Sequence, residues 1–231
     1  RDRLPALHSY FALRAKKLGL EKLDMYDIYN PLVHEASKEV SWEQARQWTI
    51  DALRPLGEEY GSVLRSAFDQ RWIDSLECKG KKSGAYSSGC YRKPPYILMN
   101  FSGNLDSVFT LAHELGHSLH SHFSDTAQKF HYASYAIFVA EVASTTNEML
   151  LHRHLFQLAD SKELKSYLLN HLADELRGTL FRQTMFAEFE KTIHEMSANS
   201  EPLTADSLSQ SYYKLNAEYH GPAVAPDKRI E

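Results

Sequence analysis

The sequence predicts a mainly α-helical protein with one small β element. Long stretches carry apolar residues at spacings of three and four, which is the periodicity of one helix face. Glycine, proline and capping residues stand where several of these stretches begin or end. One short apolar run, residues 96–101, follows a Pro-Pro pair and favours a strand instead.

Three helices are expected in the first third of the chain, covering residues 3–19, 41–53 and 55–73. Gly19 suits the left-handed conformation that ends many helices. Ser41 and Gln44 have the spacing of a capping box, and Pro55 fits the first turn of a helix. These elements are expected to be scaffold, joined by an extended connector over residues 23–33.

A loop rich in Gly, Ser and Lys is expected over residues 77–89. Residues 84–86 are a second strand candidate beside residues 96–101. Such a sheet could add an extended peptide along its edge, or it could be a structural hairpin under the following helix.

The rest of the chain is expected to be helical. The predicted helices cover residues 105–123, 134–158, 161–196, and a last segment that Thr204 caps and Gly221 stops, with a polar break at residues 124–132.

Composition limits the classes of partner. The net charge is −4 and no basic stripe stands out, which argues against nucleic acid or an anionic membrane as partner. No run of about 18 apolar residues exists, so we expect no membrane span. Cys78 and Cys90 are too few for a disulfide scaffold, so free thiols and a cytoplasmic location are expected.

Both ends of the sequence look cut. The chain opens on Arg1-Asp2-Arg3 without a methionine or a signal peptide, and it closes abruptly at residues 228–231. We therefore expect a piece of a longer protein.

The central motif is His113-Glu114-Leu115-Gly116-His117, an H-E-x-x-H pentad. Residues four apart share a helix face, so both imidazoles can reach one metal ion. An apolar stripe runs along a different face of the same predicted helix and consists of Leu105, Val108, Ala112, Leu115 and Leu119. The alternative is a surface helix that carries histidines by chance.

A catalytic zinc site needs a third protein ligand. Position 123 is Phe123, which excludes the H-E-x-x-H-x-x-G-x-x-H arrangement, so a glutamate on a following helix is expected. Glu141 is the acid of an otherwise apolar stretch, where a metal ion would compensate for burial of its charge. A salt bridge to an Arg or Lys is the alternative. Glu148, two turns further on, could accept a hydrogen bond from a ligand histidine.

Five runs resemble oligoendopeptidase F, a zinc metallopeptidase related to thimet oligopeptidase and neurolysin. They are GKKSGAYSSG, PYILMNFSG, FTLAHELGHSLHS, IFVAEVASTTNEMLL and RQTMFAEFE. The resemblance extends over essentially the whole chain. It implies a multi-helical, zincin-type catalytic lobe beside a channel that admits short peptides.

The resemblance also implies site roles. His113, His117 and Glu141 would bind one Zn²⁺ ion, and Glu114 would be the general base that assists attack of zinc-bound water on a peptide bond. Residues 1–231 would be an incomplete catalytic domain, because the family has a helical region before it. A later tyrosine- and histidine-rich segment, expected beyond Glu231, would stabilise the oxyanion.

Three interpretations follow. The first is a zinc endopeptidase that hydrolyses short peptides, and the second is a folded zinc-binding fragment that is inactive without the missing segment. The third is a helical interaction protein with an incidental pentad, which leaves Glu141 unexplained. His120, one turn past His117, could contact substrate or simply pack.

Overall fold

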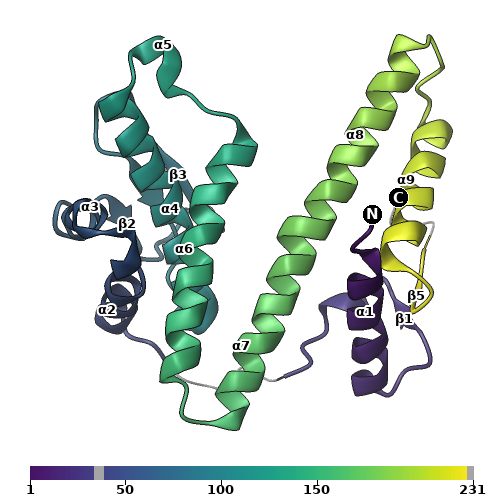
Figure 1. The fold of residues 1–231 in the computed structure, drawn as a ribbon, viewed down its shortest axis with the longest axis horizontal. Helices are drawn as coiled ribbons and strands as arrows, with labels where there is room; N and C mark the ends of the chain where they lie inside the picture. The colour runs from purple at the N-terminus through teal and green to yellow at the C-terminus, as the bar shows by residue number, and fades with distance from the viewer. Residues whose placement is uncertain (34–38, 228–231) are drawn as a thin grey trace. The chain divides into compact units, whose positions relative to one another are not determined.

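The computed structural model describes residues 1–33 and 39–227, so the closing residues 228–231 lie outside it. The chain divides into two compact units. One comprises residues 35–165 and the other comprises residues 1–34 and 166–231. Helices dominate both units, which confirms the predicted mainly α class (Figure 1). Among the described residues, no helix is long and apolar enough to cross a membrane.

The unit of residues 35–165, called here the pentad unit, is built on the helix that carries the pentad. Its helical segments are α2 (Trp42–Ala52), η2 (Arg54–Leu56), α3 (Glu58–Asp69), α4 (Leu105–Ala127), α5 (Phe130–Ala133) and α6 (Ile137–Leu158). The Ser41 side chain accepts a hydrogen bond from the Gln44 N–H at the start of α2, which is one of the two hydrogen bonds of the predicted capping box.

The predicted helix over residues 55–73 is wrong at both ends. Pro55 lies in the short 3₁₀ segment η2, and Gly57, with φ of 93°, separates η2 from α3. Helix α3 then ends at Asp69. Ile73 is in a strand, because its backbone pairs with Ile97.

A three-stranded sheet precedes α4 in the pentad unit. Its strands are β2 (Ile73–Asp74), β3 (Tyr86–Ser88) and β4 (Tyr96–Leu98), in the order β2-β4-β3. β2 is parallel to β4 and β3 is antiparallel to it, so β3 lies at an edge. The prediction for residues 96–101 is confirmed at its first half, and the second strand begins at Tyr86 rather than at Gly84.

Helix α4 begins with a capping box in which the Asn104 side chain accepts from the Ser107 N–H. It continues to Ala127, through part of the predicted polar break. The apolar stripe is confirmed, because its five residues are at most 2% exposed: Leu105, Val108, Ala112, Leu115 and Leu119. Burying this face fixes the rotation of α4, so its other faces are available for chemistry.

Helices α4 and α6 pack side by side (Figure 1). A Cβ added to Gly116 would lie 2.6 Å from Ser144 Cα, so the two backbones are close at this point. The buried amide of Asn147 donates to the Ala112 carbonyl at 3.1 Å. Its side-chain oxygen accepts from the Tyr60 hydroxyl at 3.0 Å, which ties α3 to the same crossing.

The other unit has its own core and a second small sheet. Its elements are α1 (Leu4–Leu18), β1 (Leu23–Asp24), η1 (Asp27–Tyr29), the π-helical segment η3 (Leu176–Phe181), α8 (Arg182–Ala198), α9 (Ala205–His220) and β5 (Val224–Ala225). α7 (Lys162–Glu175) begins in the pentad unit and ends in this one. The caps predicted at Gly19, Thr204 and Gly221 are confirmed.

Two predictions in this unit need correction. Residues 23–33 are not a plain extended connector, because Leu23 and Asp24 pair in parallel with Val224 and Ala225. The single helix predicted over residues 161–196 is interrupted by η3.

Candidate metal centre

His113 and His117 project from one face of α4. They are four residues apart, and their Nε2 atoms lie 3.0 Å from each other. The side chains are partly exposed, 25% for His113 and 18% for His117. Both imidazoles are therefore attached to the same helix and remain accessible to solvent.

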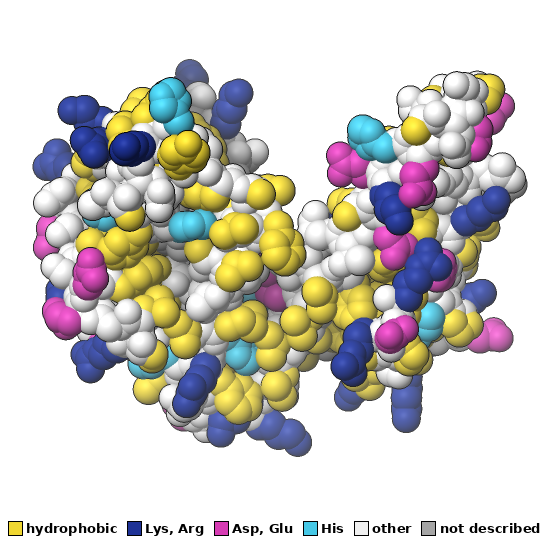
Figure 2. Space-filling view, turned by 45° about the horizontal axis from the view of Figure 1, so that its top comes forward, with side chains coloured by type: hydrophobic (Ala, Val, Ile, Leu, Met, Phe, Trp, Pro, Cys, Tyr) yellow, Lys and Arg dark blue, Asp and Glu magenta, His cyan; other side chains and the backbone are white. Residues whose placement is uncertain are grey.

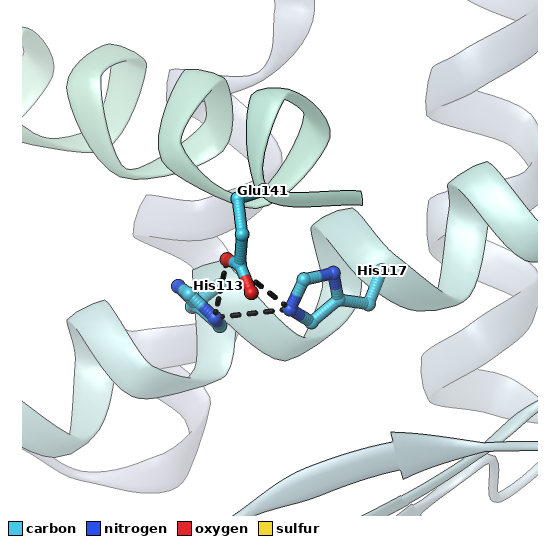
Figure 3. Close-up of side chains that lie close together, drawn as sticks. All are labelled: His113, His117 and Glu141. Carbon is cyan, nitrogen blue, oxygen red and sulfur yellow. Dashed lines mark hydrogen bonds and ion pairs between the residues drawn. The ribbon is translucent and has the colours of Figure 1, made fainter. Parts of the chain in front are cut away.

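Glu141 reaches these histidines from the first turns of α6 (Figure 3). Its Oε2 lies 3.6 Å from His113 Nε2 and 3.7 Å from His117 Nε2. The three donor atoms are all within 4.8 Å of one another. Ser144 Oγ donates to the same Oε2 at 2.8 Å and restrains the carboxylate.

These separations fit a zinc ion. Zinc–nitrogen and zinc–oxygen bonds of about 2.0–2.1 Å in a tetrahedron place neighbouring donor atoms about 3.3 Å apart. The observed distances of 3.0, 3.6 and 3.7 Å lie around that value. Two imidazole nitrogens and one carboxylate oxygen leave a fourth tetrahedral position for water or substrate.

One premise of the sequence argument for Glu141 is wrong. The carboxylate was expected to be buried in an apolar stretch, yet its side chain is 44% exposed. The neighbouring Ile137, Phe138 and Val142 are also exposed, at 73%, 79% and 53%. The packing of α6 on α4, rather than burial of a charge, brings Glu141 to the histidines.

Glu148 lies two turns further along α6, against the other nitrogen of His113. Its Oε1 contacts His113 Nδ1, and the residue is 6% exposed. Burial opposes protonation of His113, but the carboxylates of Glu148, Glu114 and Glu141 together outweigh it and raise the pKa of the imidazole. A carboxylate that accepts the Nδ1 proton leaves Nε2 as the metal-binding atom.

Glu114 is buried beside the histidines, at 7% exposure. Burial raises the pKa of its carboxyl group, while His113 and a backbone hydrogen bond from Ser87 on β3 oppose the rise. Its Oε2 has no hydrogen-bond partner among the described residues. This oxygen is an acceptor that the described side chains leave unpaired and shielded from solvent.

Burial affects the protonation of two further imidazoles, those of His117 in the pentad and His120 one turn later. Burial lowers the pKa of His117, and proximity to His113 lowers it further. His120 stacks on Tyr135 with ring centroids 3.9 Å apart, and burial lowers its pKa as well. This stacking is the packing role that the sequence left open for His120.

Sequence reasoning did not find two residues that shape the site. Ser87 bonds Glu114 through its backbone, and its hydroxyl lies 2.7 Å from that of Ser118 on α4. No local pattern marks Ser87. Gly116 does carry a signal, because a glycine inside a helix often marks close packing.

A pentad helix with a glutamate from a second helix is the ligand arrangement of His₂Glu zinc peptidases. The chain belongs to peptidase family M3, whose model matches residues 1–231. This confirms the resemblance seen in the sequence.

Similar proteins carry peptidase names. The chain is 49% identical over 227 residues to oligopeptidase PepF of Bacillus subtilis, covering 98% of this chain and 34% of that protein. It is 44% identical over 228 residues to the chromosomal oligoendopeptidase F of Lactococcus lactis, covering 99% of this chain and 38% of that protein. A crystal structure of oligoendopeptidase-F from Enterococcus faecium matches with a TM-score of 0.66 and 38% identity, covering 99% of this chain and 33% of that one. The chain thus spans about a third of the length of these relatives.

Proposed function

We propose that this chain forms the metal centre of a zinc-dependent endopeptidase that hydrolyses short peptides. The observation that supports this most is the convergence of His113, His117 and Glu141, whose donor atoms lie within 4.8 Å of one another. The names of the relatives, oligopeptidase and oligoendopeptidase, support the substrate class.

His113, His117 and Glu141 would hold the ion, with Glu148 fixing His113. A zinc ion in this position would supply a Lewis acid that polarises the peptide carbonyl and acidifies water. Glu114 lies on the same helix beside His113, and burial raises the pKa of its carboxyl group, so it would take a proton from the attacking water. It would then deliver that proton to the leaving amine.

Strand β3 would align the peptide. It is an edge strand of its sheet, and the backbone of Ser87 at its centre makes a hydrogen bond with the Glu114 carboxylate. An extended peptide that pairs with β3 would run past the carboxylate, because backbone hydrogen bonds hold it along the edge. The contact of the Ser87 hydroxyl with Ser118 on α4 fits a structural hairpin as well, which stays the alternative.

A second candidate is a folded zinc-binding piece without activity of its own. The coverage of about a third of the relatives favours it. The resemblance assigns oxyanion stabilisation to a segment beyond Glu231, and removal of one oxyanion donor typically slows a reaction by about 10²- to 10³-fold.

The remaining expectations stay proposals. Cys78 and Cys90 are exposed, and free thiols at these positions would suit a reducing, cytoplasmic location. The net charge of −4 supports a peptide partner over nucleic acid or an anionic membrane.

The first test measures bound zinc and hydrolysis of a quenched fluorescent oligopeptide. It compares the unsubstituted chain with Glu114→Gln, and Glu190→Gln on exposed α8 is the matched control. We expect one zinc ion per chain in all three and a loss of about 10²- to 10⁴-fold in kcat for Glu114→Gln alone.

The other outcomes separate the two candidates. Stoichiometric zinc without hydrolysis in any variant, with activity in a longer polypeptide that contains this chain, would support the second. Absence of zinc from all three would contradict both.

A further inference from the structure

A cavity of about 350 Å³ lies in the pentad unit beyond the candidate metal centre. It is bounded by the second half of α4, the connection between β3 and β4, and the segment around α5. Its α4 wall is formed by Ser121 and Asp125, which follow His117 at successive spacings of four. The cavity therefore opens on the histidine face of α4, one turn or about 6 Å past His117.

The edge strand leads into the same cavity. Ser87 on β3 bonds Glu114, and Gly89 and Cys90 line the cavity two and three residues later. Two residues of extended chain span about 7 Å. A peptide that runs along β3 past Glu114 would thus bring a side chain to the cavity about two residues from the bond being cleaved.

Three aromatic side chains line the cavity, those of Tyr91, Phe130 and Tyr135. Tyr135 stacks on His120 and shares a hydrogen bond with Ser121, so its ring is held in place. Tyr91 is fixed by donation of its hydroxyl to the Gln128 carbonyl at 2.7 Å. Phe130 meets the Tyr91 ring edge-on at 5.4 Å and remains 65% exposed.

The charges in the wall favour a neutral occupant. The wall carries one cation, Lys93, and one anion, Asp125, which accepts a hydrogen bond from the Arg92 N–H at 3.3 Å. Neither sign of charge dominates, whereas ordered rings favour another ring by offset or edge-to-face contact. Hydrophobic side chains gather on the face of the pentad unit that Figure 2 draws.

We propose that this cavity is a subsite that binds an aromatic side chain of the peptide substrate, about two residues from the scissile bond. The proposal rests on the function proposed above for the metal centre. A volume of about 350 Å³ accommodates one aromatic side chain together with water.

The test uses a variant that fills the cavity. Ser134 lines it and is exposed, so Ser134→Trp adds a ring at the mouth without removing a buried contact. Thr126→Trp, at an exposed position near the end of α4 outside the cavity wall, is the matched control. Each is made in the zinc-loaded Glu114→Gln background, where peptides bind without turnover.

Calorimetry then measures the Kd of alanine-based heptapeptides with one phenylalanine moved along the sequence, and of the all-alanine peptide. With an unblocked cavity, the peptide with phenylalanine at one position is expected to bind about 10-fold more tightly than the all-alanine peptide, because ring contact adds to the burial of apolar area. Ser134→Trp is expected to abolish that preference, and Thr126→Trp is expected to preserve it.

Equal Kd values for all peptides before blocking, or a preference that survives Ser134→Trp, would overturn the subsite. If zinc binds and the unsubstituted chain or the longer polypeptide cleaves all-alanine peptide, that result leaves the proposed function intact. If the chain binds no zinc, the proposed function is wrong. The same titrations on the metal-free protein then show whether the cavity still prefers phenylalanine, so the subsite is tested independently.

Discussion

At the scale of single residues, two acids of α6 contact different nitrogen atoms of His113. Glu141 points its carboxylate at both Nε2 atoms, whereas Glu148 occupies the Nδ1 side of His113. Glu148 is buried at 6% exposure and its Oε2 has no partner among the described residues. Burying such a group costs folding energy, which its contact with the His113 imidazole offsets in part.

Glu148→Ala is therefore expected to weaken zinc binding by about 10- to 100-fold, because His113 would lose the group that holds its ring and tautomer. Competition with a chelating dye measures the affinity. Glu148→Gln, whose amide oxygen can still accept the Nδ1 proton, is expected to bind zinc with intermediate affinity.

Glu190→Ala, at an exposed position of α8, is the control that shows how loss of a surface carboxylate by itself affects zinc affinity. Zinc affinity unchanged in Glu148→Ala would remove Glu148 from the site. A fall in thermal stability of the metal-free protein with no change in zinc affinity would assign it to folding alone.

At the scale of elements, the close approach of α4 and α6 decides whether the three donor atoms meet. The sequence places the histidines on one helix and Glu141 on another, but their separation depends on Gly116. A Cβ at this position would lie 2.6 Å from Ser144 Cα and 2.8 Å from the Ala143 carbonyl oxygen. These are backbone atoms, so relief requires that the helices move apart.

Gly116→Ala is expected to lower the free energy of unfolding by about 1–3 kcal/mol, as overpacking of a tight interface does. It should also weaken zinc binding, since Glu141 moves with α6. Urea unfolding and the same chelator competition measure the two effects.

Gly178 offers the matched control, because a Cβ there meets nothing within 4 Å. Gly178→Ala is expected to leave zinc affinity unchanged and stability equal or slightly higher, given the better helix propensity of alanine. Equal effects of the two substitutions would show that helix spacing at Gly116 does not control the site.

Other elements show where local patterns were sufficient. The capping residues Ser41 and Thr204 act within four residues of themselves, so sequence reasoning found the starts of α2 and α9. Strands β1 and β5 were missed because each needs a partner about 200 residues away, Leu23 beside Val224.

At the scale of the whole molecule, the candidate site belongs to one of the two units. His113, His117, Glu141, Glu114 and Glu148 all lie between residues 35 and 165. The other unit has a separate core around Leu7, Phe11 and Met185. A ligand that binds the folded site stabilises the part of the chain that must unfold to release it.

Zinc at about 100 times its Kd is thus expected to raise the free energy of the opening that exposes amides of α4 and α6 to exchange by about 2.7 kcal/mol. Removal of zinc by a chelator is expected to reverse this increase. Amides of α1 and α9 are expected to change little. Hydrogen exchange with and without zinc measures this. Equal protection in all four helices would mean that the two units unfold together, and no protection in α4 would contradict zinc binding at the pentad.

The sequence by itself determined the helical class, the face of α4 that carries the two pentad histidines, and the apolar stripe on a different face of that helix. It also pointed to Glu141 and Glu148. These inferences depend on helical periodicity and on residue chemistry, both of which act over a few neighbouring positions. The tertiary structure decided which nitrogen each glutamate faces, the spacing at Gly116, the contact of Ser87 with Glu114 and the cavity beyond His117. Each of these joins segments distant in the chain, and their separation is set by packing of whole helices and strands, which no local pattern records.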